Sequence, residues 1–111
     1  MEDTDAVIAM AALAQPTRLK TFRLLVRSEP GGLPAGEIAR VIGVPQNTMS
    51  AHLNSLARAG LVAGQRRSRK VIYRANVAQL GNLTGFLVND CCGGNPEACA
   101  ALAIAAPSCR P

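Results

Sequence analysis

The feature that most constrains the fold is a pair of predicted helices separated by a very short turn. Residues 35–42 and 46–59 carry apolar side chains at helical spacing, and Gly43-Val44-Pro45 lies between them. Glycine favours the end of the first helix, and proline favours the start of the second. Two helices joined in this way form the helix-turn-helix pattern. The predicted inward positions are Ile38, Val41 and Ile42 in the first helix and Met49, Leu53 and Leu56 in the second.

Three further helices are predicted from start and stop signals. They run from residue 4 or 5 to residue 13, over residues 16–27, and over about residues 77–90. Pro96 can start a further Ala-rich turn or helix. The predicted apolar faces are Val7, Ile8, Ala11 and Ala12 in the first, Leu19, Phe22, Leu25 and Val26 in the second, and Leu80, Leu83, Phe86 and Leu87 in the third.

A β-hairpin is predicted between the helix-turn-helix pair and the last helix. Residues 61–65 and 71–75 are predicted to be strands, because they are rich in β-forming residues and flank a polar, basic segment. The predicted fold class is therefore mainly α with a small β-hairpin.

The size and composition of the chain restrict its class. A chain of 111 residues accommodates one domain, and 49% apolar with 17% charged residues is typical of a globular protein. No apolar run reaches the roughly 18 residues of a membrane span, and the acidic N-terminus is unlike a signal peptide. We expect a cytoplasmic protein with no membrane partner, and such a short chain gains stability from a partner subunit.

The basic residues gather in one stretch of a chain with net charge +5. Between Glu37 and Asp90 there is no acidic residue, and four bases crowd the predicted hairpin tip, where they repel one another without an anion. This pattern favours a nucleic-acid partner over the alternative, a merely solvated hairpin. The bases of the stretch are Arg40, Arg58, Arg66, Arg67, Arg69, Lys70 and Arg74.

The second helix of the pair carries side chains suited to duplex DNA. Gln46 and Asn47 can make bidentate contacts to adenine, and Thr48 and the helix N-terminus suit phosphate. One Tyr and two Phe provide no stacking platform for single strands, so the predicted partner is double-stranded DNA. The candidate DNA-binding residues are Gln46, Asn47, Thr48, Ser50, Ala51, His52, Arg66, Arg67, Arg69 and Lys70.

Some of these residues have another explanation. Capping and surface polarity account for Gln46, Asn47 and Thr48 about as well as base contacts do. His52 is the only histidine, so a DNA contact or a structural role suits it better than a His-based metal site.

Three motifs in order resemble the ArsR/SmtB family of winged-helix repressors. They are residues 13–19 (LAQPTRL), residues 48–56 (TMSAHLNSL) with 59–62 (AGLV), and the basic hairpin through Tyr73-Arg74. The resemblance covers about residues 6–90. It implies a winged helix-turn-helix, a homodimer through the first and last helices, and one recognition helix per subunit in adjacent major grooves. It also implies a wing on the flanking backbone and a repressor that leaves its operator when an inducer binds.

All four cysteines lie in the last fifth of the chain, at Cys91, Cys92, Cys99 and Cys109. They cannot tie the first ninety residues together, so we expect free thiols available for metal or redox chemistry. Residues 91–99 (CCGGNPEAC) resemble a group of the family with a Cys-Cys pair at the end of the last helix and a further Cys shortly after. The inducers of that group are trivalent arsenic and antimony. Two other family sites are not supported, because residues 37–41 lack cysteine and the last helix lacks histidine.

Trivalent arsenic is thiophilic and takes three sulfur ligands, whereas zinc usually takes four. The predicted metal-site residues are Cys91, Cys92 and Cys99, with Gly93-Gly94 allowing the backbone to turn back. The sequence does not decide whether Cys109 is a further ligand. We expect arsenite or antimonite as inducer, no organic cofactor, and one domain over residues 1–111 with an inducer-binding segment at 91–111.

Several alternatives remain at the sequence level. The same repressor could sense methylarsenite, a divalent soft metal such as cadmium, lead or zinc, or oxidation of the adjacent thiols. An enzyme is not expected and no catalytic residue is predicted, because the chain has neither a Cys-x-x-Cys pair nor a Gly-rich phosphate loop. A DNA-packaging protein would not need the cysteines. The operator is not given by the sequence.

Overall fold

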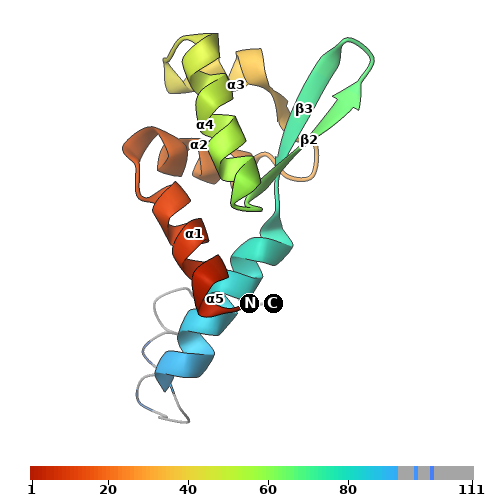
Figure 1. Cartoon of the computed structure of the whole chain (residues 1–111). Coiled ribbons are helices and arrows are strands. Elements are labelled where there is room, and N and C mark those ends of the chain that lie inside the picture. The colour runs from red at the N-terminus through yellow and green to blue at the C-terminus, as the bar shows by residue number, and fades with distance from the viewer. Residues whose placement is uncertain (93–96, 98–100, 102–111) are drawn as a thin grey trace.

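The computed structural model describes residues 1–92, 97 and 101. Residues 1–92 form five helices and a three-stranded antiparallel sheet of order β1-β3-β2, and the β2–β3 hairpin projects from the helices (Figure 1). The predicted winged helix-turn-helix is confirmed. The elements are α1 (Asp3–Leu13), α2 (Pro16–Arg27), β1 (Leu33–Pro34), α3 (Ala35–Ile42), α4 (Gln46–Arg58), β2 (Val62–Arg67), β3 (Lys70–Ala75) and α5 (Val77–Cys92).

The turn between α1 and α2 is fixed by neighbouring polar groups. Gln15 caps α2, because its Oε1 accepts a hydrogen bond of 2.8 Å from the backbone amide of Arg18. Pro16 takes the first helical position, where no amide hydrogen is needed. The Nε of Arg18 donates to the carbonyl oxygen of Ala12 at 2.7 Å and so ties the two helices together. The predicted break before Pro16 is confirmed.

The hairpin is present, and its two strands are longer toward the tip than predicted. The structure adds a strand that the sequence did not predict, β1, in which Leu33 pairs with Tyr73 and Pro34 pairs with Ile72. A two-residue strand shows no alternation of apolar and polar residues, so no pattern revealed it. β1 connects the hairpin to the segment that enters α3.

The core is centred on the apolar stripe of α4. Met49, Leu53 and Leu56 are fully buried, as predicted. Thr21 is also fully buried, and its hydroxyl donates to the Met49 sulfur at 3.6 Å. The other buried apolar residues come from the remaining helices and the root of the hairpin: Ala6, Ala9, Phe22, Leu25, Ile38, Ala39, Ala59, Leu61, Val62, Ala75 and Leu83.

Three predicted core positions of α2, α3 and α5 are wrong. Leu19 is 44% exposed, Val41 is 48% exposed, and Leu87 is also exposed. The cause is where each helix meets the core. The face of α2 is centred nearer Thr21, which displaces Leu19 to its edge, and α3 uses Ala39 in place of Val41. The other predicted positions of these helices are buried or packed against the core.

Of the predicted apolar face of α1, Ala12 packs against the core, whereas Val7, Ile8 and Ala11 are exposed. Val7 is 60% exposed and Ile8 is 48% exposed, whereas Ala6 and Ala9 make the contact with the core. The small alanine side chains let α1 pack closely against its neighbours while the larger apolar side chains remain on the surface.

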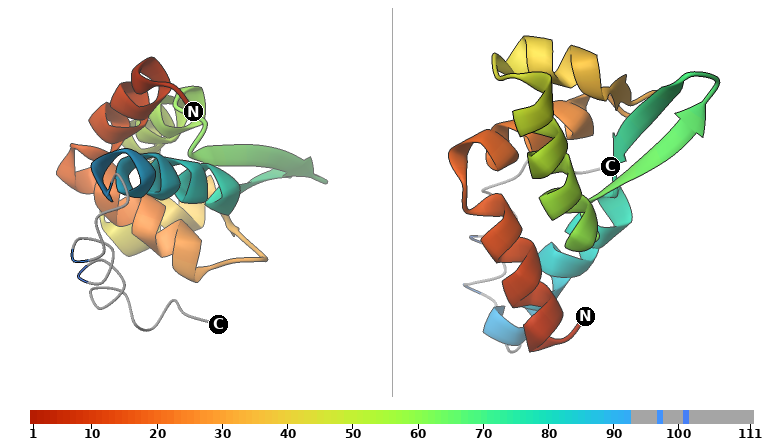
Figure 2. Two further views of the ribbon diagram at one scale, coloured as in Figure 1. Left: turned by 90° about the horizontal axis from the view of Figure 1, so that it is seen from below. Right: turned by 45° about the horizontal axis from the view of Figure 1, so that its top comes forward.

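The molecule has two distinct ends. Figures 1 and 2 show the N-terminus of α4 and the hairpin tip at one end, and α1 beside α5 at the other. Asn76 connects the turn that follows α4 with the start of α5. Its Nδ2 donates to the Gly60 carbonyl oxygen at 2.9 Å, and its Oδ1 accepts from the Gln79 amide at 3.1 Å. The start of α5 is thereby fixed to the turn that follows α4.

The burial pattern makes a prediction about stability. Leu53→Ala should lower the free energy of unfolding by about 2–5 kcal/mol, because it leaves a cavity in the core. Val41→Ala, at an exposed position, should change it by less than about 0.5 kcal/mol. Urea unfolding of both variants at one protein concentration measures the difference, and equal losses would contradict the observed burial.

Candidate nucleic-acid interface

The turn between α3 and α4 sets the position of the candidate recognition helix. Gly43 ends α3 in the left-handed conformation, with φ 85°, and its amide donates to the Ala39 carbonyl oxygen at 2.8 Å. Pro45 is extended and leads directly into the first turn of α4. Pro45 provides no side-chain cap for that turn, and the turn contains no acidic residue. The positive end of the helix dipole is therefore exposed at the surface.

The polar face of α4 lies opposite the buried stripe. Because successive residues are about 100° apart around a helix, Gln46, Ser50 and Asn54 share one side and Asn47 and Ala51 lie next to them. All except Ser50 are exposed, and Ser50 is half-buried. Thr48 is exposed, and its amide donates to the Asn47 Oδ1 at 2.9 Å. Five neighbouring positions, without Thr48, therefore offer amide, hydroxyl and methyl groups to a ligand, and Thr48 lies about 160° around the helix from Ser50.

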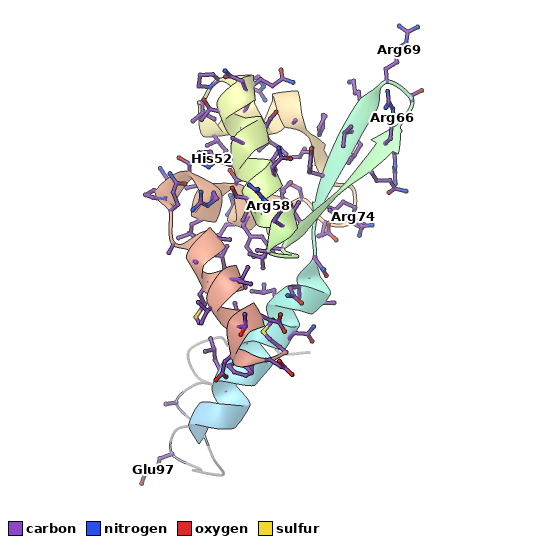
Figure 3. The ribbon with its side chains drawn as sticks, viewed as in Figure 1. His52, Arg58, Arg66, Arg69, Arg74 and Glu97 are labelled. Atoms are coloured by element: carbon purple, nitrogen blue, oxygen red, sulfur yellow. The ribbon has the colours of Figure 1, made fainter. Side chains whose placement is uncertain are left out.

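His52 is separated from this face. It is half-buried, and Figure 3 shows it on the side of α4 that faces away from the hairpin. It lies about 200° around the helix from Ser50. Of the predicted contacts on α4, only Thr48 shares this side of the helix with His52, and the half-burial of His52 favours the structural alternative for this residue.

The hairpin tip carries the predicted cluster of bases. A two-residue turn at Ser68-Arg69 joins the strands, and Arg67 pairs directly with Lys70 across the ladder. Like charges in this position repel each other, and an anion relieves that repulsion. Arg66 and Arg69 complete the cluster, and Figure 3 shows them at the outer end of the hairpin. All four side chains are exposed.

A hollow of about 560 Å³ brings α4 and the hairpin together. Gln46 and Ser50 line it from α4, and Arg69 and Lys70 line it from the hairpin. The rest of the lining comes from β1, the start of α3 and two further residues of β3: Pro34, Ala35, Gly36, Glu37, Val71 and Tyr73. Four of the predicted DNA-binding residues thus share one concave surface with a positive edge.

Two of the seven bases in the acid-free stretch are neutralised by acids at or before its start. Arg40 forms an ion pair with Glu37 one turn away on α3. Arg74 forms a bidentate pair with Glu29, with Nη2 2.8 Å from Oε1 and Nε 3.1 Å from Oε2. The hydrogen bond from Arg74 lowers the pKa of Glu29, and the hydrogen bond from Arg40 lowers the pKa of Glu37. Among the side chains that the structure describes, the other five bases have no acidic partner.

The predicted thiol site falls largely outside the described residues. Cys91 and Cys92 are the last two residues of α5, but their side chains are not among those described, and Cys99 lies outside the described residues altogether. In the part of the chain that the structure describes, no group of three or more His, Cys, Asp or Glu side chains could hold a metal ion. No described helix is both long and apolar enough to cross a membrane.

Comparison with known proteins agrees with this geometry. A family profile described as a helix-turn-helix domain matches residues 13–65. The transcriptional regulator NmtR of Mycobacterium tuberculosis is 38% identical over 74 residues, which are 64% of this chain and 59% of NmtR. The transcriptional repressor SdpR of Bacillus subtilis is 30% identical over 78 residues, which are 70% of this chain and 83% of SdpR. The matched region thus spans about three-fifths of NmtR and most of SdpR.

Solved structures are similar over most of the chain. An ArsR-like transcriptional regulator from Rhodococcus sp. RHA1 superposes with a TM-score of 0.73 at 25% identity, covering 92% of this chain and 93% of that one. A homodimeric winged helix-turn-helix domain from Mycobacterium bovis, a possible ArsR-family regulator, gives 0.63 at 27% identity, covering 81% and 89%. A possible transcriptional regulator for arsenical resistance gives 0.61 at 28% identity, covering 68% and 76%.

The fold and its basic concave surface define a winged helix-turn-helix regulator that binds DNA. The chain belongs to the ArsR/SmtB family of transcriptional regulators.

The α3–α4 turn predicts opposite effects at two glycines. Gly43→Ala should lower the free energy of unfolding by about 1–2 kcal/mol, because the added Cβ is strained at positive φ. Gly36→Ala, within α3 and with only ordinary contact to Gln46, should raise it by roughly 0.5–1 kcal/mol. Urea unfolding distinguishes the two, and a stabilising Gly43→Ala would contradict the turn geometry.

Proposed function

We propose that this protein is a homodimeric repressor that binds operator DNA and releases it when trivalent arsenic or antimony binds a cysteine cluster. The observation that carries the DNA-binding part is the hollow shared by α4 and the hairpin, edged by bases without acidic partners. The negative phosphates of a DNA duplex would neutralise these basic side chains. As in other members of its family, the activity is regulation rather than catalysis.

Two kinds of DNA contact follow from the positions of the residues. Gln46, Asn47, Ser50 and Ala51 on the exposed side of α4 face base edges in the major groove, where amides pair with adenine and methyl groups contact thymine. The α4 N-terminus and Thr48 bind phosphate. The hairpin tip binds flanking phosphates through Arg66, Arg67, Arg69 and Lys70.

A homodimer through α1 and α5 accounts for the apolar surface at the other end of the molecule. Val7, Ile8 and Met10 of α1 and Leu87 of α5 are exposed large apolar residues, and the two helices contact each other. A second copy would cover this surface and place two α4 helices against half-sites about one DNA turn apart. The homodimeric M. bovis neighbour supports this arrangement.

The inducer site is assigned to Cys91, Cys92 and Cys99 on the chemistry of the donor set. Thiolates are the ligands that trivalent arsenic prefers, and the likeness to a possible regulator for arsenical resistance supports this choice. Residues 91–111 then form the inducer-binding segment of one domain that spans the chain. A ligand at the end of α5 changes the dimer and thereby the spacing of the α4 helices, with a typical coupling of about 1–3 kcal/mol.

The alternative is the same repressor with another signal. Methylarsenite needs fewer sulfur ligands than arsenite, zinc usually takes four, and an oxidant converts adjacent thiols to a disulfide. Cadmium and lead are the other divalent soft metals that suit thiolate ligands. Release of DNA by each of these agents in parallel with arsenite identifies the signal. Cytoplasmic location follows from the need for reduced thiols and access to DNA.

The hairpin bases make a prediction about salt dependence. The operator is first selected by the parent protein from a random pool of duplexes about 30 base pairs long, enough for two half-sites. Alanine at Arg66, Arg67, Arg69 or Lys70 should lower the slope of log affinity against log salt by about 1 for each phosphate that the dimer no longer binds. Lys20→Ala, an exposed base on α2, is the matched control and should leave the slope unchanged. Failure of the parent to enrich any sequence would contradict specific DNA binding.

The cysteines make a prediction about release. Cys91→Ser, Cys92→Ser and Cys99→Ser should each bind the selected operator like the parent but remain bound when arsenite is added. Cys109→Ser is the matched control and should release normally in a gel-shift titration. Release by all three site variants would refute the thiol site. If Cys109→Ser also stays bound, Cys109 takes part in the response to arsenite.

A further inference from the structure

The ion pair between Glu29 and Arg74 joins two segments that are 45 residues apart in sequence. Glu29 lies in the turn after α2, and Arg74 lies near the root of the hairpin on β3 (Figure 3). The Glu29 side chain is only 21% exposed, and both of its oxygens accept from the guanidinium group. A bidentate pair of this kind fixes direction as well as distance.

The turn after α2 also packs closely against β3 at Gly32. Gly32 has φ 73°, and a Cβ placed there would lie 2.5 Å from the Tyr73 carbonyl oxygen and 2.7 Å from the Arg74 Cγ. Immediately after it, β1 pairs with Ile72 and Tyr73. Backbone pairing, close packing and the ion pair therefore all hold residues 72–74 of β3 against the segment that leads into α3.

The tip of the hairpin has no comparable support. The segment of β3 that pairs with β1 starts at Ile72, two residues after the strand begins at Lys70. The four basic residues at the tip are exposed. Lys70 is four residues from Arg74, which is roughly 13 Å along a strand. A rotation of about 10° at the root would move the tip by roughly 2 Å, enough to break a hydrogen bond to phosphate.

We propose that Glu29 and Arg74 are positioning residues that aim the hairpin tip at the DNA backbone, and that Arg74 is not itself a phosphate contact. This inference rests on the proposed DNA-binding function. It also predicts a change in DNA affinity opposite to the one that charge alone would give. Removing a carboxylate from a protein that binds DNA ordinarily strengthens binding, because less negative charge repels the phosphates. Removing the carboxylate of Glu29 should weaken it.

The test compares Glu29→Gln with Glu37→Gln on the operator selected by the parent. Both variants remove one acidic charge and free one arginine, but the Glu37–Arg40 pair lies within α3 and holds no second segment. Glu29→Gln should weaken binding by roughly 5-fold or more and reduce the salt slope, because the misaligned tip binds fewer phosphates. Glu37→Gln should bind equally or more tightly. Equal or tighter binding by Glu29→Gln would overturn the proposal.

Two further variants distinguish a positioning role of the Glu29–Arg74 pair from a direct contact of Arg74 with phosphate and from a loss of folding. Arg74→Lys keeps the charge but lacks the planar fork, so it should weaken binding like Glu29→Gln, whereas parent-like binding would assign Arg74 to the phosphates. The charge swap Glu29→Arg with Arg74→Glu keeps the net charge and should recover most of the affinity that Glu29→Gln lacks. A swap no better than Glu29→Gln, with both proteins folded by circular dichroism, would also overturn the proposal. Failure of the parent to select DNA would instead remove the proposed function.

Discussion

Burial of one apolar stripe on α4 is the constraint on which the rest of the structure depends. Met49, Leu53 and Leu56 are completely enclosed, and α1, α2, α3 and the start of β2 pack around α4. Because a helix has a fixed angular period, burying this stripe also decides that Ser50 and Asn54 face outward. The candidate recognition surface is thus oriented by the core behind it, without polar contacts of its own to hold it in place.

The sequence predicted the helices well because their ends carry local signals. The Gln15-Pro16 start of α2 and the Gly43 end of α3 need only neighbouring residues to act. The sequence-based predictions were wrong where the burial of a side chain or the presence of a strand depends on contacts with residues far away in the chain. Leu19 and Val41 fit a helical apolar pattern, but the angle at which each helix meets the core leaves them exposed. β1 exists only because β3 lies beside it.

The same distinction applies to the candidate site. The concentration of bases at the hairpin tip is a local property, so the sequence predicted Arg66 to Lys70 as a cluster, and the structure places them together. Charge counting could not separate Arg74 from these bases, because its partner Glu29 lies 45 residues earlier and outside the acid-free stretch. The thiol site was inferred from a resemblance over Cys91 to Cys99, and it stays a prediction, since Cys99 lies outside the described residues.

The C-terminal end of α5 and the hairpin tip lie at opposite ends of the molecule, and this arrangement has a thermodynamic consequence (Figure 1). A ligand at the end of α5 would not occupy the space that DNA needs, so protein, operator and ligand can form one ternary complex. In such a complex the two binding free energies are linked, and the linkage is reciprocal. If the ligand lowers operator affinity by some factor, the operator lowers ligand affinity by the same factor. Repressor that is bound to its operator is then a less sensitive detector than repressor that is free in solution.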